Sequence, residues 1–440
     1  MNNLKSDLYF LSAFANRQFL FMIATIPASL RQRFQNIRQQ TEALCAPLQT
    51  EDFVVQPIVD VSPPKWHLGH TTWFFENFIL SKYVPGYKLF NADYNYFFNS
   101  YYESQGPRVL RSHRGNMTRP SAADVFAYRK YVNEHLSAFL EKNDAIAANE
   151  ELALTLEIGL QHEQQHQELL VTDLKYILGN NPLFPVYQSS AIAPASKSRP
   201  VAWLEFEGGL HEIGYRGDGF CWDNEQSVHQ VYQEGFAIQD RLVTNGEYLE
   251  FMQQGGYRHF EFWLMEGWEW AKQLEEKAPL YWYQLDGEWW HYTLQGFEKV
   301  NPNVPVTHLS YFEADAFANW KGLRLPTEFE WEIACKLSQS SIPAAANFLE
   351  DQHFHPQAAK GTQLFGDAWE WTSSAYLPYP RYPRFKGALG EYNGKFMVNQ
   401  MVLRGGSVAT PRSHIRATYR NFFHADKRWQ FTGIRLAKSL

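Results

Sequence analysis

The chain has 440 residues and a formal net charge of -7, from 40 lysines and arginines against 47 aspartates and glutamates. This charge, and the lack of a basic run at either terminus, argue against the positive surface that a nucleic-acid partner requires. Hydrophobic residues make up 45% and aromatic residues 16% of the chain, which excludes a disordered protein and, at this length, predicts two or three globular domains.

The N-terminal segment contains an eight-residue apolar stretch, Phe19–Ile26, after Arg17. It is much shorter than the ~20 residues of a membrane helix, so no membrane partner is expected. It resembles a poor signal-peptide core, and we favour an N-terminal helix or an over-long start instead. Cys45, Cys221 and Cys335 lie far apart without a CxxC pair, which favours a reducing compartment and predicts a cytoplasmic protein.

Four segments in the first 180 residues place apolar side chains at helical intervals: Leu30–Leu48, Trp66–Tyr83, Ser121–Lys142 and Asn149–Leu178. Four helices in this length predict an all-α, up-and-down four-helix bundle over residues 28–180. In such a bundle, a metal or ligand site is built from side chains that point inward. The long connection Val84–Pro120 is expected to be functional.

Residues 181–200 are rich in proline, serine and alanine without periodicity, which predicts a linker. Short aromatic and β-branched runs follow at Val201–Glu205, Phe236–Ile238 and Trp289–Thr293, together with two predicted helices at Asn245–Gln254 and Tyr311–Lys321. The sequence therefore predicts a multidomain protein whose second domain, residues 201–440, is α+β.

The strongest local signal is the pair His162 and His166 in the last bundle helix, because residues four apart share a helix face and can hold one metal ion. Such pairs are also common on solvated helices, so the pair alone leaves metal binding open. The segment matches the HExxH pattern of zinc proteases, with Glu163 as general base. The continuation Gln167-Glu168-Leu169 lacks the glycine and third histidine of one protease class, which argues against a protease.

A third ligand is better supplied by the segment WHLGHTTWFFE, in which we choose His70 and interpret His67 as a surface residue or an outer partner. Three neutral imidazoles leave coordination positions open, which suits zinc hydrolysis or ferrous iron that binds substrate and dioxygen. Gln165 and Glu168 are candidates to orient the ligands or to touch substrate.

The loop between the helices carries Tyr101, Tyr102, Arg108 and Arg111. Paired tyrosines beside a metal can supply a proton or a hydrogen atom, and two arginines three residues apart can bind a carboxylate. In a chain this rich in aromatic residues, packing is the alternative role for the tyrosines.

The second domain contains four short motifs in this order: NGEY from Asn245, LRLPTEFEWE from Leu323, GDAWEWTS from Gly366 and LRGGS from Leu403. They resemble the formylglycine-generating-enzyme, or sulfatase-modifying-factor, domain, a C-type-lectin-like α+β fold. The first domain resembles a DinB-like bundle. With WHLGHTTWFFE, HEQQHQE and YRNFFHADKRWQFTGIRLA, the chain resembles the iron-dependent sulfoxide synthases of ergothioneine biosynthesis.

This resemblance implies Fe(II) bound by His70, His162 and His166, and an O2-dependent reaction that joins a thiol sulfur to the imidazole of hercynine (N-trimethylhistidine). The implied partners are small molecules: hercynine, cysteine and O2. True formylglycine-generating enzymes use a cysteine pair, but the second domain has Cys221 and Cys335 alone, and Cys335 is predicted to lie in the core.

The resemblance also suggests the sulfur donor. The branch that uses free cysteine carries the tyrosine pair that Tyr101 and Tyr102 match, and Arg108 and Arg111 match positions that hold the thiol substrate's carboxylate. Phe423 stands where the branch using γ-glutamylcysteine is expected to carry an acidic residue. Cysteine is therefore the predicted donor.

The hercynine site is expected between the domains, and Asn421 matches a residue near it. An aromatic and polar wall from Trp371, Phe422 and Phe423 would suit the quaternary ammonium of hercynine.

Three alternatives stay open. One is a selenoneine synthase with a selenosugar donor. The second is a DinB-type, metal-dependent thiol transferase with a lectin-like binding module, in which the tyrosines only pack. The third is an inactive ligand-binding protein, which the retention of all three candidate ligands makes the weakest.

Overall fold

The computed structural model describes residues 30–100, 102, 105–141, 146, 149–189, 198–382 and 393–440. The chain divides into two compact units, Met1–Leu170 with Arg216–Cys221, and Val171–Tyr215 with Trp222–Leu440. The division falls inside helix α8 (Glu150–Gly179). Boundaries at residues 28–180 and 201–440 remain predictions, and Phe19–Ile26 lies outside the described residues.

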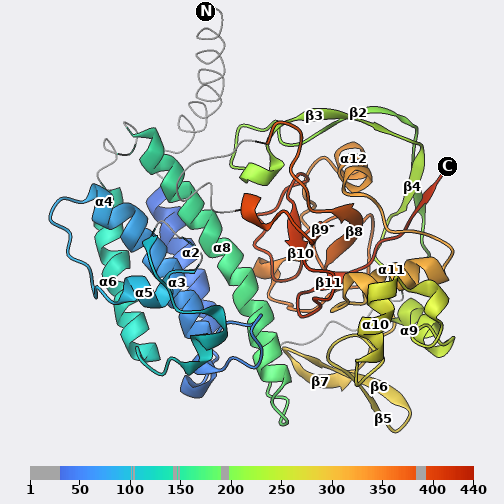
Figure 1. Ribbon diagram of the computed structural model, residues 1–440, viewed down its shortest axis with the longest axis horizontal. Helices are drawn as coiled ribbons and strands as arrows, with labels where there is room; N and C mark the ends of the chain where they lie inside the picture. The colour runs from blue at the N-terminus through green and yellow to red at the C-terminus, as the bar shows by residue number, and fades with distance from the viewer. Residues whose placement is uncertain are drawn as a thin grey trace, which may run out of the picture. The chain divides into compact units, whose positions relative to one another are not determined.

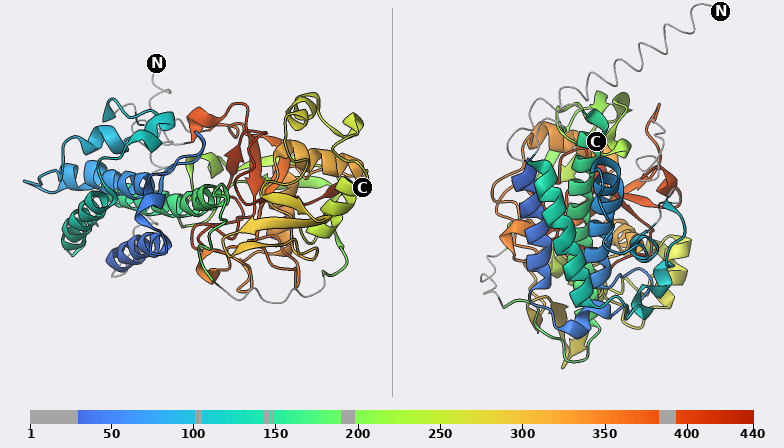
Figure 2. Two further views of the ribbon diagram at one scale, coloured as in Figure 1. Left: turned by 90° about the horizontal axis from the view of Figure 1, so that it is seen from below. Right: turned by 90° about the vertical axis from the view of Figure 1, so that its left-hand side faces the viewer.

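The first unit is the predicted helical bundle. Its long helices are α2 (Leu30–Cys45), α3 (Pro64–Phe75), α6 (Ala122–Leu140) and the first part of α8 (Glu150–Gly179). They run side by side in Figure 1 and in the right-hand view of Figure 2. Helix α3 continues through a π-helical turn, η2 (Glu76–Leu80), into α4 (Ser81–Tyr83), so the four predicted helices are confirmed to within a few residues at their ends.

Local sequence determines where α6 begins and which of its faces is buried. The Ser121 hydroxyl accepts a hydrogen bond from the Asp124 backbone N–H (3.1 Å), and the Asp124 carboxylate accepts one from the Ser121 backbone N–H (2.9 Å), which is a capping box. Val125, Val132 and Leu136 follow on the buried face at helical spacing.

The connection at residues 84–120 contains α5 (Tyr94–Phe98) and the 3-10 helix η4 (Arg111–Asn116). Helix α5 packs closely on α3 because residue 69 is glycine: a Cβ atom there would lie 2.1 Å from Cε1 of Phe98. This close approach brings the Phe98 carbonyl to the side chain of His70 (2.6 Å).

The second unit is the predicted α+β domain, and its described residues form four small sheets in the orders β1-β4-β12, β10-β9-β8-β11, β2-β3 and β5-β6-β7. The strands are β1 (Trp203–Phe206), β2 (Gly209–Ile213), β3 (His229–Gln233), β4 (Phe236–Gln239), β5 (Trp282–Leu285), β6 (Glu288–Thr293), β7 (Gly296–Lys299), β8 (Trp369–Ala375), β9 (Met401–Arg404), β10 (Asn421–Phe423), β11 (Thr432–Gly433) and β12 (Ala437–Ser439). All pairs are antiparallel except β8 with β11.

Besides the last part of α8, the α-helices described in this unit are α9 (Asn245–Gln253), α10 (Met265–Lys272), α11 (Tyr311–Trp320) and α12 (Glu328–Ser338). Cys335 of α12 is fully buried, as predicted, and burial raises the pKa of its thiol. Within the part of the chain that the structure describes, no helix combines the length and the apolar character needed to cross a membrane.

Candidate metal centre

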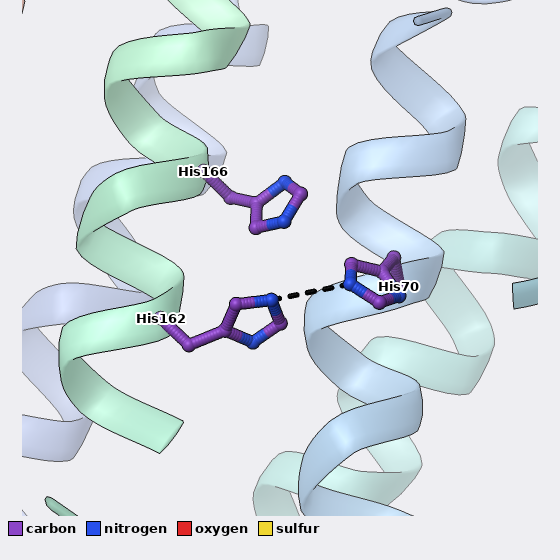
Figure 3. Close-up of side chains that lie close together, drawn as sticks. All are labelled: His70, His162 and His166. Carbon is purple, nitrogen blue, oxygen red and sulfur yellow. Dashed lines mark hydrogen bonds between the residues drawn. The ribbon is translucent and has the colours of Figure 1, made fainter. Parts of the chain in front are cut away.

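Three histidines of the first unit converge inside the bundle. His162 and His166 project from α8 toward His70 on α3, as Figure 3 shows. One nitrogen from each ring lies within 4.8 Å of the others, and Nε2 of His70 is 3.1 Å from Nε2 of His162. All three side chains are buried. Three nitrogens at ~2.0–2.1 Å from one ion lie a little over 3 Å apart, so this spacing fits a single metal.

The protonation of these rings suits coordination. The Nδ1 atom of His70 lies 2.6 Å from the Phe98 carbonyl, which can only accept, so Nδ1 carries the proton and Nε2 keeps its lone pair. Burial lowers the pKa of His162 to about 3 and the pKa values of His70 and His166 well below the usual range. Near neutral pH, the site therefore offers three neutral imidazoles, which fit a divalent cation.

Aromatic rings fix the orientation of His70. Trp66 stacks on one side of it (ring centroids 4.6 Å apart, 13° between planes) and Trp73 lies on it in a similar parallel orientation (5.5 Å, 15°). The guanidinium of Arg114 lies over Trp66, 3.3 Å from its centroid. His67 is also buried, with Nδ1 2.9 Å from Nδ1 of His166, so its interpretation as a surface residue is wrong and that as an outer partner fits.

Glu163 lies in a separate buried network. Its carboxylate accepts hydrogen bonds from Arg38 (2.9 Å), Arg129 (2.5 Å) and the Thr41 hydroxyl (2.7 Å). Burial alone would raise its pKa, but the two guanidinium groups outweigh this and hold the pKa at about 2. A carboxylate this acidic is a poor proton acceptor at neutral pH, which argues against the protease base role.

Sequence reasoning missed this network, although a signal was present. Arg38 follows Phe34 by four residues on the buried face of α2, and Arg129 lies between Val125 and Val132 on that of α6. A charged residue at a core position of an amphipathic helix indicates a buried ion pair, because an isolated buried charge is too costly.

The predicted loop residues are only partly brought to the site. Tyr101 lies outside the described residues. Tyr102 is fully buried, with its ring 5.5 Å from Trp73 and 6.4 Å from Phe74, whose own ring is 5.1 Å from His162.

The remaining predicted residues of this unit differ in exposure. Arg111 is exposed and its guanidinium donates to the Asp60 carbonyl (2.5 Å), while Arg108 is half-buried. On α8, Gln165 is half-buried and Glu168 is buried.

In the second unit, Asn421, Phe422 and Phe423 form β10, the edge strand of its four-stranded sheet, and all three are half-buried. Phe422 stacks on Tyr376 (4.0 Å, 11°), and such a partly exposed aromatic surface suits a ligand. Trp371 on β8 is fully buried and its indole N–H donates to the Leu309 carbonyl (2.9 Å), so it fits a binding role least well.

Comparison with known proteins adds to this geometry. Residues 33–170 match the DinB superfamily, and residues 188–360 and 351–440 match the sulfatase-modifying factor enzyme 1-like domain. The chain is 33% identical over 371 residues to hercynine oxygenase of Mycolicibacterium thermoresistibile, which covers 75% of this chain and 77% of that protein.

Two further relatives carry related names. Hercynine oxygenase of Mycobacterium tuberculosis is 30% identical over 412 residues, or 86% of this chain and 91% of that protein. Ergothioneine biosynthesis protein 1 of Schizosaccharomyces pombe is 28% identical over half of this chain and 28% of its own length.

Proposed function

We propose that this protein requires Fe(II) and O2 and takes cysteine as its sulfur donor. The chain belongs to the hercynine oxygenase family and is an oxygenase of ergothioneine biosynthesis. The thiol S–H and an imidazole C–H are replaced by a C–S bond, and one oxygen atom ends on sulfur. The other oxygen atom leaves as water with the two hydrogens, so the four electrons lost by the substrates reduce one O2. We expect the reaction in the reducing cytoplasm.

The observation that carries this proposal is the convergence of His70, His162 and His166. Bound there, Fe(II) would supply a redox-active ion with open coordination positions, which O2 activation needs, while the net electrons come from the substrates. The Phe98 carbonyl holds His70 in the tautomer that leaves Nε2 available, and His67 lies against His166. With three neutral ligands, the charge of the ion remains available to attract an anionic thiolate.

The other predicted residues receive proposed roles. Arg108 and Arg111 bind the carboxylate of cysteine, and Gln165 touches substrate. The half-buried strand Asn421–Phe423 recognises hercynine, whose quaternary ammonium is attracted to the faces of aromatic rings, whereas the fully buried Trp371 only supports this sheet.

We expect protein reconstituted anaerobically with Fe(II) and then exposed to O2 to convert hercynine and cysteine into the coupled sulfoxide. Mass spectrometry of parallel reactions with cysteine, γ-glutamylcysteine or a selenosugar measures donor choice. A dominant γ-glutamylcysteine or selenosugar product would contradict the donor assignment. Coupling without O2, or equal activity with zinc in place of iron, would contradict the oxygenase chemistry and favour a thiol transferase.

We expect Tyr102→Phe, alone and with Tyr101→Phe, to retain metal and substrate binding but to shift product from coupled sulfoxide toward the sulfinic acid of cysteine. A phenol has a reference pKa of ~10 and can donate a proton at neutral pH, which phenylalanine cannot. The ratio of sulfoxide to sulfinate measures the effect. Tyr87→Phe, which removes a hydroxyl bound to Glu76, is the matched control. An unchanged ratio in both tyrosine variants would assign them to packing alone.

A further inference from the structure

A second group of metal-ligand side chains lies in the C-terminal unit, where nothing in the proposed reaction uses it. His291, Glu298 and His355 each offer one ligand atom, and these atoms lie within 4.8 Å of one another. Nε2 of His291 is 3.7 Å from Oε1 of Glu298, and the rings of His291 and His355 have centroids 5.4 Å apart. The three side chains thus surround one point.

The fold places these residues together from three segments. His291 on β6 and Glu298 on β7 are direct cross-strand partners, so their side chains lie on one face of the hairpin. His355 follows the 3-10 helix η7 (Leu349–Asp351). Two bonds hold its loop: Gln295 in the hairpin turn donates to the His353 carbonyl (2.9 Å), and Asn347 donates to the His355 carbonyl (3.0 Å).

Each of the three side chains has a buried polar atom without a hydrogen-bond partner among the residues that the structure describes. These atoms are Nε2 of His291, Oε1 of Glu298 and Nδ1 of His355. Both histidines are more than nine-tenths buried. Buried polar atoms are normally paired, so three unpaired atoms facing one point indicate a missing ligand common to all of them.

We propose that His291, Glu298 and His355 bind a divalent transition-metal cation such as zinc. Two imidazoles and one carboxylate are a ligand set that zinc uses, whereas calcium and magnesium favour oxygen ligands alone. The ion would tie the β6–β7 hairpin to the loop around His355 and so stabilise this part of the C-terminal unit.

The electrostatic surroundings are compatible with this assignment. Burial lowers the pKa of His355 to about 3 and that of His291 well below its usual range, so both imidazoles are neutral ligands near neutral pH. The nearby Lys175 ammonium would oppose a cation. Burial lowers the pKa of Lys175 to about 7, and its Nζ lies 2.8 Å from Nε2 of His308, which weakens that opposition.

The test uses the full chain carrying His162→Ala, which disables the bundle site, after removal of metal with a chelator. We expect this protein to bind one equivalent of Co²⁺ with visible d–d absorption, and Zn²⁺ to displace it and raise the melting temperature. Adding His355→Ala should weaken binding by about 100-fold or more, because changing even an outer partner of a ligand costs about 10- to 100-fold.

His353→Ala is the matched control, since His353 lies two residues away on the same loop and is exposed; it should leave both signals unchanged. Glu298→Gln preserves the shape of the side chain and is the second ligand variant. It should also weaken Co²⁺ binding, and it tests the site if His355→Ala fails to fold. The proposal is overturned if the His162→Ala chain binds no Co²⁺, if binding survives both ligand variants, or if His353→Ala weakens it equally.

Discussion

Replacing His162 with alanine is expected to remove one equivalent of bound iron and to reduce sulfoxide formation to the level of the metal-free protein. The variant leaves two of three imidazoles, and His70 loses the ring whose Nε2 faces its own at 3.1 Å. We expect iron affinity at this site to fall by more than about 100-fold, because loss of a direct ligand should exceed the cost of losing an outer partner. Iron content by elemental analysis and product formation by mass spectrometry measure both effects.

His113→Ala is the control for this experiment, because His113 is an exposed histidine of the same unit, on η4. It should retain iron and activity. An unchanged iron affinity in His162→Ala would contradict the bundle site, whereas normal iron with no product would place His162 in a step after metal binding.

The second large effect is expected for Glu163→Gln. Glu163 compensates the charges of Arg38 and Arg129, and all three side chains are at most 2% exposed. The neutral amide would leave two buried guanidinium groups without a counter-ion on α8, which typically costs about 3–5 kcal/mol of unfolding free energy. Urea denaturation of the wild-type protein and of the Glu163→Gln variant measures the difference in unfolding free energy.

Glu151→Gln on the same helix is the matched control. Its ion pair with Lys82 is solvent-exposed on both sides, and such pairs contribute at most about 1 kcal/mol. If Glu163→Gln destabilised the protein no more than this control, the buried network would not be a major source of stability.

The same carboxylate predicts how stability depends on pH. The pKa of Glu163 is about 2 in the folded protein against 4.5 for a free glutamate, so the unfolded chain binds the proton more tightly. The stabilisation is complete above pH 4.5 and is lost as the pH falls from about 4.5 toward 2. Glu163→Gln should lack this component, and a pH series of urea denaturation measurements on both proteins tests the sign.

Helical periodicity identified the bundle because each of its long helices buries one face, and the i,i+4 rule identified His162 and His166. The sequence also contains a signal for the start of α12, which periodicity alone does not predict. Thr327 and Glu330 form the capping box that begins this helix, with the Thr327 hydroxyl accepting from the Glu330 backbone N–H (3.1 Å).

Other features depend on contacts that periodicity does not encode. The bond from His70 to the Phe98 carbonyl requires the close packing of α5 on Gly69, and nothing local marks a carbonyl as a partner. His355 is distant in sequence from His291 and reaches it through an irregular loop. Tertiary structure alone brings such residues together, so neither contact could be predicted from spacing.

Helix α8 limits where the two units of this protein can be separated. Its residues up to Leu170 belong to the first unit and those from Val171 to the second, without a break in the helix. Within the second unit, Asp173 accepts a hydrogen bond from the Trp429 indole (3.1 Å) and Lys175 pairs with His308.

A fusion protein in which another domain is joined at residues 181–200 would therefore lack Asp173 and Lys175. The C-terminal unit would then lose two of its buried polar partners. His162 and His166 lie on the same continuous helix as Asp173 and Lys175. An exchange of the C-terminal unit would therefore have to include the Val171–Gly179 part of α8 to keep these partners.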